Sequence, residues 1–180
     1  MYERPKLLIN SLGEIKVSID TDQNYYCEQQ VRIAMLWHDL KDVNNKSISN
    51  SIKKFSTLSR YEMENLSEKV DLKYLLGILN SKYAKSLLSN IRGGDYHIVP
   101  EHIRNIPIPN VAANQQKPII SLVDRILSTK KSDPQTDTSA LERQIDEMIY
   151  KLYKLTYDEV KVIDPEFWLS EDEYKNVKLD

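Results

Sequence analysis

The sequence predicts an α+β fold in which a β-rich N-terminal part is followed by a C-terminal helical hairpin. Near the N-terminus, apolar residues alternate with polar ones, which is the pattern of a half-buried strand. In residues 71–91, and again in the last third of the chain, apolar residues recur every three or four positions, as on one face of a helix. We therefore expect two parts: residues 1–110, which hold one long helix at 71–91, and residues 111–180.

The N-terminal strands are predicted from two short segments. KLLIN is an apolar run, and the later EIKVSID places Ile15, Val17 and Ile19 on one face. Gly13 marks the turn between these segments. The next apolar segment, YYCEQQVRIAMLW, fits either a third strand or the start of a helix. Two or three strands are expected.

Residues 38–70 are rich in Ser, Asn and Lys and poor in large aliphatic residues. This composition predicts an irregular excursion with one short helix around Arg60–Glu68. Such side chains donate well to phosphates and base edges, and they equally suit a solvated loop.

The clearest helix of the N-terminal part is predicted at residues 71–91. Asp71 can cap its start, and Gly93 can end it in the left-handed conformation. Asn80 lies in the middle, where a hydrogen-bonded structural role is expected. The apolar face would consist of Leu72, Leu75, Leu76, Leu79, Tyr83, Leu87 and Ile91.

The segment RGGDYHIVPEHIRNIPIPN follows this helix and holds two of the four glycines of the chain. Its glycine pair allows a turn with positive φ, after which Tyr96 and Ile98 would face one way in a short extended stretch. Pro100 suits the first turn of a short helix, and the prolines at the end predict an extended exit. The segment is either a rigid joint or a preorganised surface for a phosphate backbone, and these two interpretations are compatible.

Two helices and a tail are predicted for residues 111–180. QKPIISLVDRILSTKK and SALERQIDEMIYKLYKL each carry an apolar stripe and are joined by a short loop, which indicates an antiparallel hairpin. Capping boxes are expected at Ser139 with Glu142, and at Thr156 with Glu159, where a further short helix begins.

Composition limits the class of protein. With 180 residues, 41% hydrophobic and 29% charged, the chain is of the soluble globular type. It has no apolar run near the length of a membrane span and no signal-peptide pattern at the start, so a cytoplasmic location without membrane contact is expected. The net charge is −2, although residues 1–110 carry 15 Lys+Arg against 13 Asp+Glu. A polyanion would therefore meet the first part.

No pattern for catalysis or metal binding is found. The four glycines form no phosphate-binding loop, and DPEF at 164–167 lacks the second proline of a methylation motif. His97 and His102 do not have the spacing of two ligands on one helical face. Cys27, the single cysteine, suits a packing role better than that of a nucleophile. We expect no catalytic residue, no metal site and no cofactor in this chain.

Taken in order, several segments resemble the TaqI-like C-terminal specificity domain of adenine-specific DNA methyltransferases and of fused type IIG restriction–modification enzymes. These segments are ERPKLLI, DQNYYC, DLKYLLGILNSKYAKSLLSNI, GGDYHIVPEHIRNIPIP and the helix–loop–helix that ends in IDEMIYKLYKLTYDE. The last motif is the most specific, and the resemblance covers most of the chain. Residues 38–70 depart from the family pattern because they are longer and more polar.

The resemblance implies a DNA methylase specificity domain-like fold, and a chain that grips duplex DNA and reads a short target sequence. It also implies that a separate N-terminal methyltransferase domain or subunit binds S-adenosylmethionine and methylates adenine N6. On this interpretation the chain alone is not an enzyme; it is a fragment or subunit of a DNA methyltransferase or type II restriction enzyme.

Candidate DNA contacts are chosen for their chemistry, since phosphate contacts come mainly from Lys and Arg. The first rank holds Lys53, Lys54, Arg60, Arg92, His97 and Arg104, and the second rank holds Lys6 and Lys16. Each could equally be a solvated surface charge. Two other functions remain open: a helical module that binds another subunit without contacting DNA, and an unrecognised nuclease.

Overall fold

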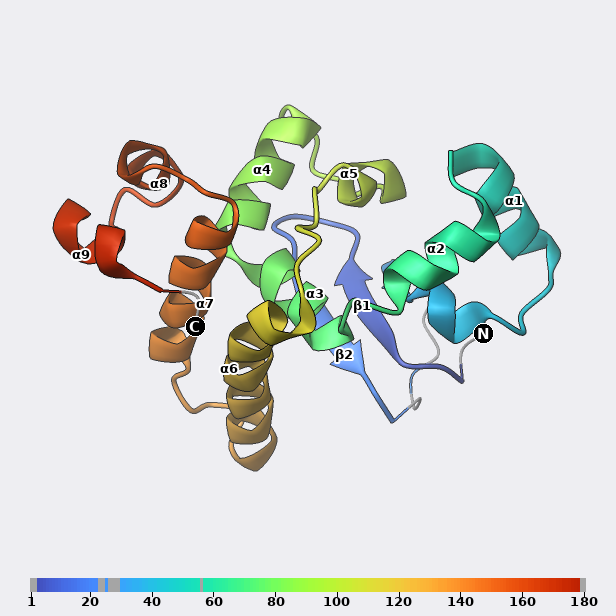
Figure 1. Ribbon diagram of the computed structural model, residues 1–180, viewed down its shortest axis with the longest axis horizontal. Helices are drawn as coiled ribbons and strands as arrows, with labels where there is room; N and C mark the ends of the chain where they lie inside the picture. Colours follow the sequence, from blue (N-terminus) through green and yellow to red (C-terminus); the bar gives the residue numbers. More distant parts are fainter. Residues whose placement is uncertain (1–2, 23–24, 26–29, 56, 179–180) are drawn as a thin grey trace.

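The computed structural model describes residues 3–22, 25, 30–55 and 57–178, without the side chains of residues 54 and 55. Within them, a small antiparallel sheet lies at the centre, with helices on either side (Figure 1). Its strands are β1 (Lys6–Asn10), β2 (Val17–Asp20) and β3 (Val31–Ala34), in the order β2-β1-β3. The prediction of two or three strands is confirmed, and the ambiguous third segment contains a strand.

Helices make up most of the described chain. They are the 3₁₀ helix η1 (Trp37–Leu40) and the α-helices α1 (Lys46–Phe55), α2 (Arg60–Ser67), α3 (Leu72–Asn80), α4 (Lys82–Arg92), α5 (Pro100–Arg104), α6 (Ala113–Ser132), α7 (Ser139–Leu152), α8 (Tyr157–Ile163) and α9 (Glu171–Asn176). Helices α1 and α2 lie at one end of the molecule, and α8 and α9 at the other (Figure 1). The α+β class is confirmed. None of the described helices is both long and apolar enough to cross a bilayer.

The single helix predicted at residues 71–91 is wrong, because the structure has two helices there. Asp71 caps α3 as predicted, and Gly93 ends α4 with φ of +57°. Between the helices, Ser81 is extended (φ −66°, ψ 156°), and its hydroxyl accepts from Ala84 N–H. A serine side chain that caps a new helix competes with continuation of the old one. The single predicted face therefore fails beyond Ser81: Leu88 is buried, whereas Leu87 is only half-buried.

Residues 38–70 are more ordered than their composition predicted. The short helix expected near Arg60 is confirmed as α2, but the irregular path expected before it is wrong, because α1 occupies residues 46–55. Asn45 Oδ1 accepts from Ile48 N–H at 3.0 Å and so satisfies a free donor at the start of α1. Ile48 is buried, and Ile52 lies four residues further along the same side of the helix. A single narrow apolar stripe is therefore enough to give this polar segment a helix, and α2 packs against η1.

The glycine-turn segment packs against the hairpin formed by β1 and β2. Ile98 N–H donates to Ser11 O at 2.8 Å, and Gly13 N–H donates to Tyr96 O at 3.0 Å. Pro100 begins α5 as predicted. The prediction that Tyr96 and Ile98 face one way is wrong: Ile98 is fully buried, whereas Tyr96 is 65% exposed.

The predicted C-terminal hairpin is confirmed as α6 and α7, followed by α8. Thr156 and Glu159 form the expected capping box. The box predicted at Ser139 is wrong, because Ser139 already belongs to α7 and the preceding Thr138 donates its hydroxyl proton to Glu142 Oε1 at 2.7 Å. The helix therefore starts one residue earlier than the sequence pattern indicated.

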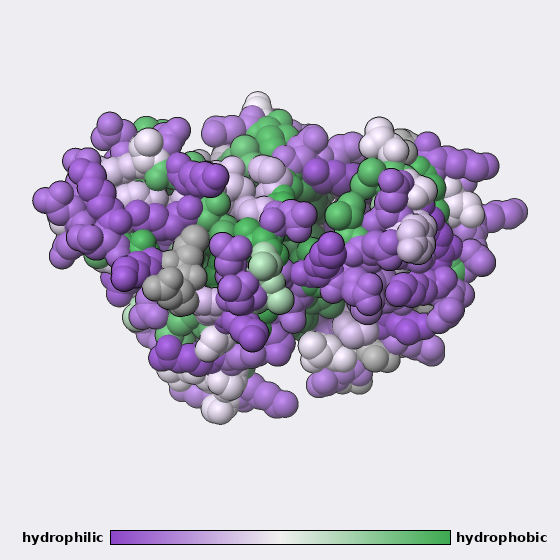
Figure 2. All heavy atoms as spheres, in the orientation of Figure 1, coloured by the Kyte–Doolittle hydropathy of each residue, from purple (hydrophilic) through white to green (hydrophobic). Residues whose placement is uncertain are grey.

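One apolar core joins the sheet, α3 and the hairpin, and it includes Leu7, Ile78, Ile119 and Ile149. Helix α3 approaches α6 closely at Gly77, where an added Cβ would lie 2.8 Å from Ile119 Cγ2. A second, smaller cluster lies between α7, α8 and α9 and consists of Tyr150, Val160, Phe167 and Tyr174. On the face seen in Figure 2, hydrophilic residues cover most of the surface.

Candidate nucleic-acid interface

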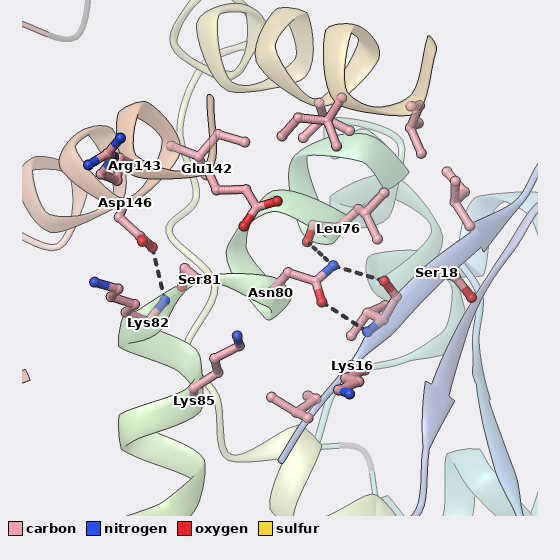
Figure 3. Close-up of a pocket in the computed structure, with 18 of the residues that line it drawn as sticks. Lys16, Ser18, Leu76, Asn80, Ser81, Lys82, Lys85, Glu142, Arg143 and Asp146 are labelled. Atoms are coloured by element: carbon pink, nitrogen blue, oxygen red, sulfur yellow. Dashed lines mark hydrogen bonds between the residues drawn. The ribbon is translucent and has the colours of Figure 1, made fainter. Parts of the chain in front are cut away.

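Three adjoining hollows follow the length of α4, and we call them together the α4 groove. The first, of about 590 Å³, lies between β2, α3, α4, α6 and α7 (Figure 3). The second, of about 450 Å³, shares Lys82 and Lys85 with the first. The third, of about 230 Å³, shares Ser89 and Arg92 with the second and reaches the glycine turn. One surface channel therefore runs from the hairpin helices to the glycine turn.

One side of the groove is a polar stripe on α4. The stripe consists of Lys82, Lys85, Ser86, Ser89 and Arg92, and all five line the second hollow. Residues three or four positions apart share a face of a helix, so these five side chains lie along one side of α4. Lysine, arginine and serine are the side chains that most often donate to phosphate oxygens. The stripe can therefore contact an anionic chain that runs along α4.

Two of the lysines in the stripe have acidic partners. Lys85 Nζ lies 3.3 Å from Glu14 Oε2, and this carboxylate is 60% exposed. Lys82 Nζ lies 2.7 Å from Asp164 Oδ2, which is almost completely buried. The first pair is open to solvent and can exchange its carboxylate for a ligand at little cost, because exposed pairs contribute about 0–1 kcal/mol. The second pair fixes Lys82 in place.

Arg92 anchors the groove at the glycine turn. Its Nη1 donates to Gly13 O at 2.6 Å, which ties α4 to the β1–β2 hairpin. Its Nε is buried and has no hydrogen-bond partner among the described residues. A buried donor without an acceptor is costly, so Arg92 is held in this position by its other contacts.

The start of α4 is already occupied by a carboxylate. Lys82 N–H donates to Asp146 Oδ1 at 2.9 Å, and Asp146, from α7, is buried (Figure 3). Burial raises the pKa of Asp146 to about 6, and the hydrogen bond from Lys82 N–H opposes this rise. Because a carboxylate fills the positive end of the helix, ligand anions are expected further along α4.

Of the first-rank candidates whose side chains are described, Arg92 alone lines the α4 groove. His97 is exposed beside the glycine turn, with Nδ1 3.2 Å from Asp95 Oδ1. Arg104 is exposed on α5, with Nη1 3.8 Å from Glu101 Oε1. The structure therefore places His97 and Arg104 beyond the end of the groove, outside its lining.

The other first-rank candidates lie on α1 and α2, away from the groove (Figure 1). Lys53 is exposed on α1, and the side chain of Lys54 lies outside the described residues. Arg60 instead holds the chain together: its guanidinium donates to Glu64 Oε1, Asn44 Oδ1, Leu40 O and Lys41 O at 2.6–2.9 Å. The two groups of candidates are therefore not brought together.

The second-rank candidates have opposite outcomes. Lys6 is completely buried and pairs with Asp20, so its prediction as a surface contact is wrong. Lys16 is exposed and lines the first hollow. Sequence reasoning missed Lys82, Lys85 and Ser89, although their three- and four-residue spacing to Arg92 was a usable signal once a helix was expected there.

Among the described residues, no three His, Cys, Asp or Glu side chains lie close enough together to hold a metal ion. Cys27 lies outside the described residues. Comparisons with models of protein families, with curated proteins and with solved structures found no match to this chain.

Proposed function

We propose that this chain binds duplex DNA through the α4 groove and serves as the target recognition part of a restriction–modification enzyme that methylates adenine N6. In this proposal, methyl transfer from S-adenosylmethionine belongs to a separate methyltransferase domain or subunit, and the present chain is not itself an enzyme. The resemblance to specificity domains supports the enzyme class. The polar stripe on α4 is the observation that carries DNA binding.

Local charge supports this assignment although the net charge of the chain is −2. The first two hollows are lined by Lys16, Lys82, Lys85, Arg92 and Arg143, against the carboxylates of Glu14, Glu142 and Asp146. Burial raises the pKa of Asp146 to about 6, so its negative charge weakens as the pH falls toward that value. Cations therefore predominate where the ligand would lie, and negative charge is carried elsewhere on the surface.

In the proposed mechanism, one set of residues holds the DNA backbone and another set reads the base sequence. Lys85, Ser89 and Arg92 contact successive phosphates along one strand, which fixes the position of the duplex and makes the affinity fall with salt. His97 and Arg104 extend beyond the groove beside the glycine turn, where they can reach base edges in the major groove. The backbone contacts between the glycine turn and the β1–β2 hairpin hold this reading segment in place.

Fluorescence anisotropy with labelled random 20-base-pair duplexes tests the proposal. Affinity should fall as salt rises from about 50 to about 200 mM, with a slope of log K against log salt of about −0.9 for each phosphate neutralised. Ser89 is exposed and lines the groove, so Ser89→Glu should weaken binding about tenfold and Ser89→Lys should strengthen it. Asn90→Glu is the matched control, because Asn90 is exposed on the same helix and does not line the groove.

Two results would contradict DNA binding at this site. The first is an absence of binding at the lower salt concentration, which the protein-interaction alternative expects. The second is an equal effect of Ser89→Glu and Asn90→Glu on DNA affinity, which would show that the DNA does not contact the polar stripe of α4. Incubation of the same duplexes with Mg²⁺ addresses the nuclease alternative, and here we expect the DNA to remain intact.

A further inference from the structure

Strand β2 is an edge strand, and its free edge borders the first hollow of the α4 groove. The strand order leaves β2 with β1 on one side only. On the other side, the Asn80 amide takes both backbone groups of Val17: Val17 N–H donates to Asn80 Oδ1, and Asn80 Nδ2 donates to Val17 O, each at 2.9 Å (Figure 3). Asn80 thus occupies the place of one residue of a neighbouring strand.

The next open position on this edge is Ile19. In an antiparallel pair, residues alternate between bonding to the partner strand and pointing their backbone groups away from it. Val17 points away from β1, so Ile19 does so as well, on the same side. Within the described ranges, no group is hydrogen-bonded to Ile19 N–H or C=O on that side. The edge therefore has one filled position and one vacant position facing the hollow.

The hollow beside this edge has an apolar wall and a cationic rim. Leu76, Val123, Ile126, Leu127 and Ile145 form the wall. Four cations lie on the rim, against the two carboxylates of Glu142 and Asp146 from α7 (Figure 3). The cations are Lys16, which directly precedes β2, Lys82 and Lys85 from α4, and Arg143 from α7. Such a site suits a ligand that offers backbone donors and acceptors on one edge, apolar side chains toward the wall and carboxylates toward the rim.

We propose that the β2 edge binds an extended segment of a partner protein in which apolar residues alternate with Asp or Glu, added as a fourth strand of the sheet. Strand addition takes its affinity from main-chain hydrogen bonds and its specificity from pockets for alternate side chains. A nucleic acid carries no such alternation of backbone N–H and C=O. The charge of the rim selects an acidic segment over a basic one. This inference does not rest on DNA binding, although the first hollow is one end of the α4 groove and Lys82 and Lys85 line both the first and the second hollow.

The probe for this proposal is the acetylated, amidated heptapeptide Glu-Val-Glu-Ile-Glu-Val-Glu, titrated into the full chain and followed by amide NMR. We expect saturable shifts at the Ile19 amide and slower hydrogen exchange there. The same peptide with Lys in place of every Glu should bind at least tenfold more weakly. No saturable binding below about 1 mM peptide, or equal affinity for the two peptides, would overturn the proposal.

Backbone N-methylation tests strand addition on the unaltered protein, so that folding is not affected. Two methylated versions of the acidic peptide are compared, one with N-methyl groups at odd positions and one with them at even positions. Because successive N–H groups of a strand point to opposite sides, one version should lose binding and the other should retain it. Equal behaviour of the two versions would refute strand addition.

Two protein variants distinguish peptide binding at the β2 edge from DNA binding at the polar stripe of α4. Leu127→Glu places a carboxylate on the apolar wall and should weaken acidic-peptide binding at least tenfold, and its fold is verified by circular dichroism. Ser89→Glu lies outside the first hollow and should leave peptide affinity unchanged while it weakens DNA binding. Loss of peptide binding with Ser89→Glu would place the peptide on the α4 stripe and overturn the assignment to β2.

Discussion

Lys6 and Asp20 form an ion pair inside the protein, with Lys6 Nζ 2.5 Å from Asp20 Oδ2 and both side chains excluded from solvent. The two residues are also direct partners in the register of β1 with β2. Asp20 Oδ2 in addition accepts from Tyr25 N–H at 3.1 Å. The pair thus secures the end of the strand whose free edge we propose as a binding site.

Removal of one partner of this pair should be strongly destabilising. Lys6→Met leaves a buried carboxylate without its cation, and we expect the free energy of unfolding to fall by about 3–5 kcal/mol. The double variant Lys6→Met with Asp20→Leu should lose much less, because no buried charge remains. Urea denaturation of the two variants measures the difference, and equal losses would show that the charges are not coupled.

We expect Arg60 to contribute to the stability of the fold. Its guanidinium makes three hydrogen bonds that join α2 to Leu40 O, Lys41 O and Asn44 Oδ1, and a fourth to Glu64 within α2. Arg60→Ala should therefore lower the free energy of unfolding by about 2 kcal/mol. Arg60→Lys should rescue little of this, since an ammonium cannot reproduce a planar fork of donors. Thermal denaturation measures both variants, and Lys53→Ala, at an exposed position on α1, serves as the control. Full rescue by lysine would mean that charge alone matters there.

The stability of the protein should depend on the titration of Asp146. In the folded state its pKa is about 6, and in the unfolded chain it is about 3.9. Between these values the folded state binds more protons, so this residue lowers the free energy of unfolding as pH rises from about 4 to about 6, by about 2–3 kcal/mol. Asp146→Asn keeps an oxygen acceptor for Lys82 N–H and removes the titration.

The measurement for this prediction is the difference in the free energy of unfolding between Asp146→Asn and the unaltered protein at several pH values. That difference should grow in favour of the variant as pH rises from 4 to 7. A difference that stays constant over this range would show that the folded and unfolded pKa values of Asp146 are equal.

Gly77 should resist replacement although it lies within a helix. Alanine at an ordinary helix position is favoured over glycine by about 1 kcal/mol. At Gly77, however, the new Cβ would lie 2.8 Å from Ile119 Cγ2, and α3 and α6 would have to separate. We expect Gly77→Ala to lower the free energy of unfolding by about 1–3 kcal/mol in urea titrations. Combined with Ile119→Ala, it should cost less than the sum of the two single changes; additive costs would rule out this contact.

Local signals in the sequence were sufficient for most elements of the fold. The alternation of Ile15, Val17 and Ile19 predicted the second strand, and Asp71, Gly93 and Thr156 each ended or began a helix where expected. These signals act within four residues along the chain, so they can be read without knowing the rest of the fold. They failed at Ser81, where a serine hydroxyl had two possible local roles and packing selected the capping one.

The sequence by itself determined the fold class, the hairpin and the existence of a helix that carries Lys82, Lys85, Ser89 and Arg92. Only the tertiary structure decided that Lys6 is buried and Lys16 exposed, and that the Asn80 amide fills one position of the β2 edge. It also decided which lysines share a groove. The physical reason is distance along the chain: the first hollow draws on residues from 15 to 146, and their proximity depends on how the sheet and the hairpin pack onto α3.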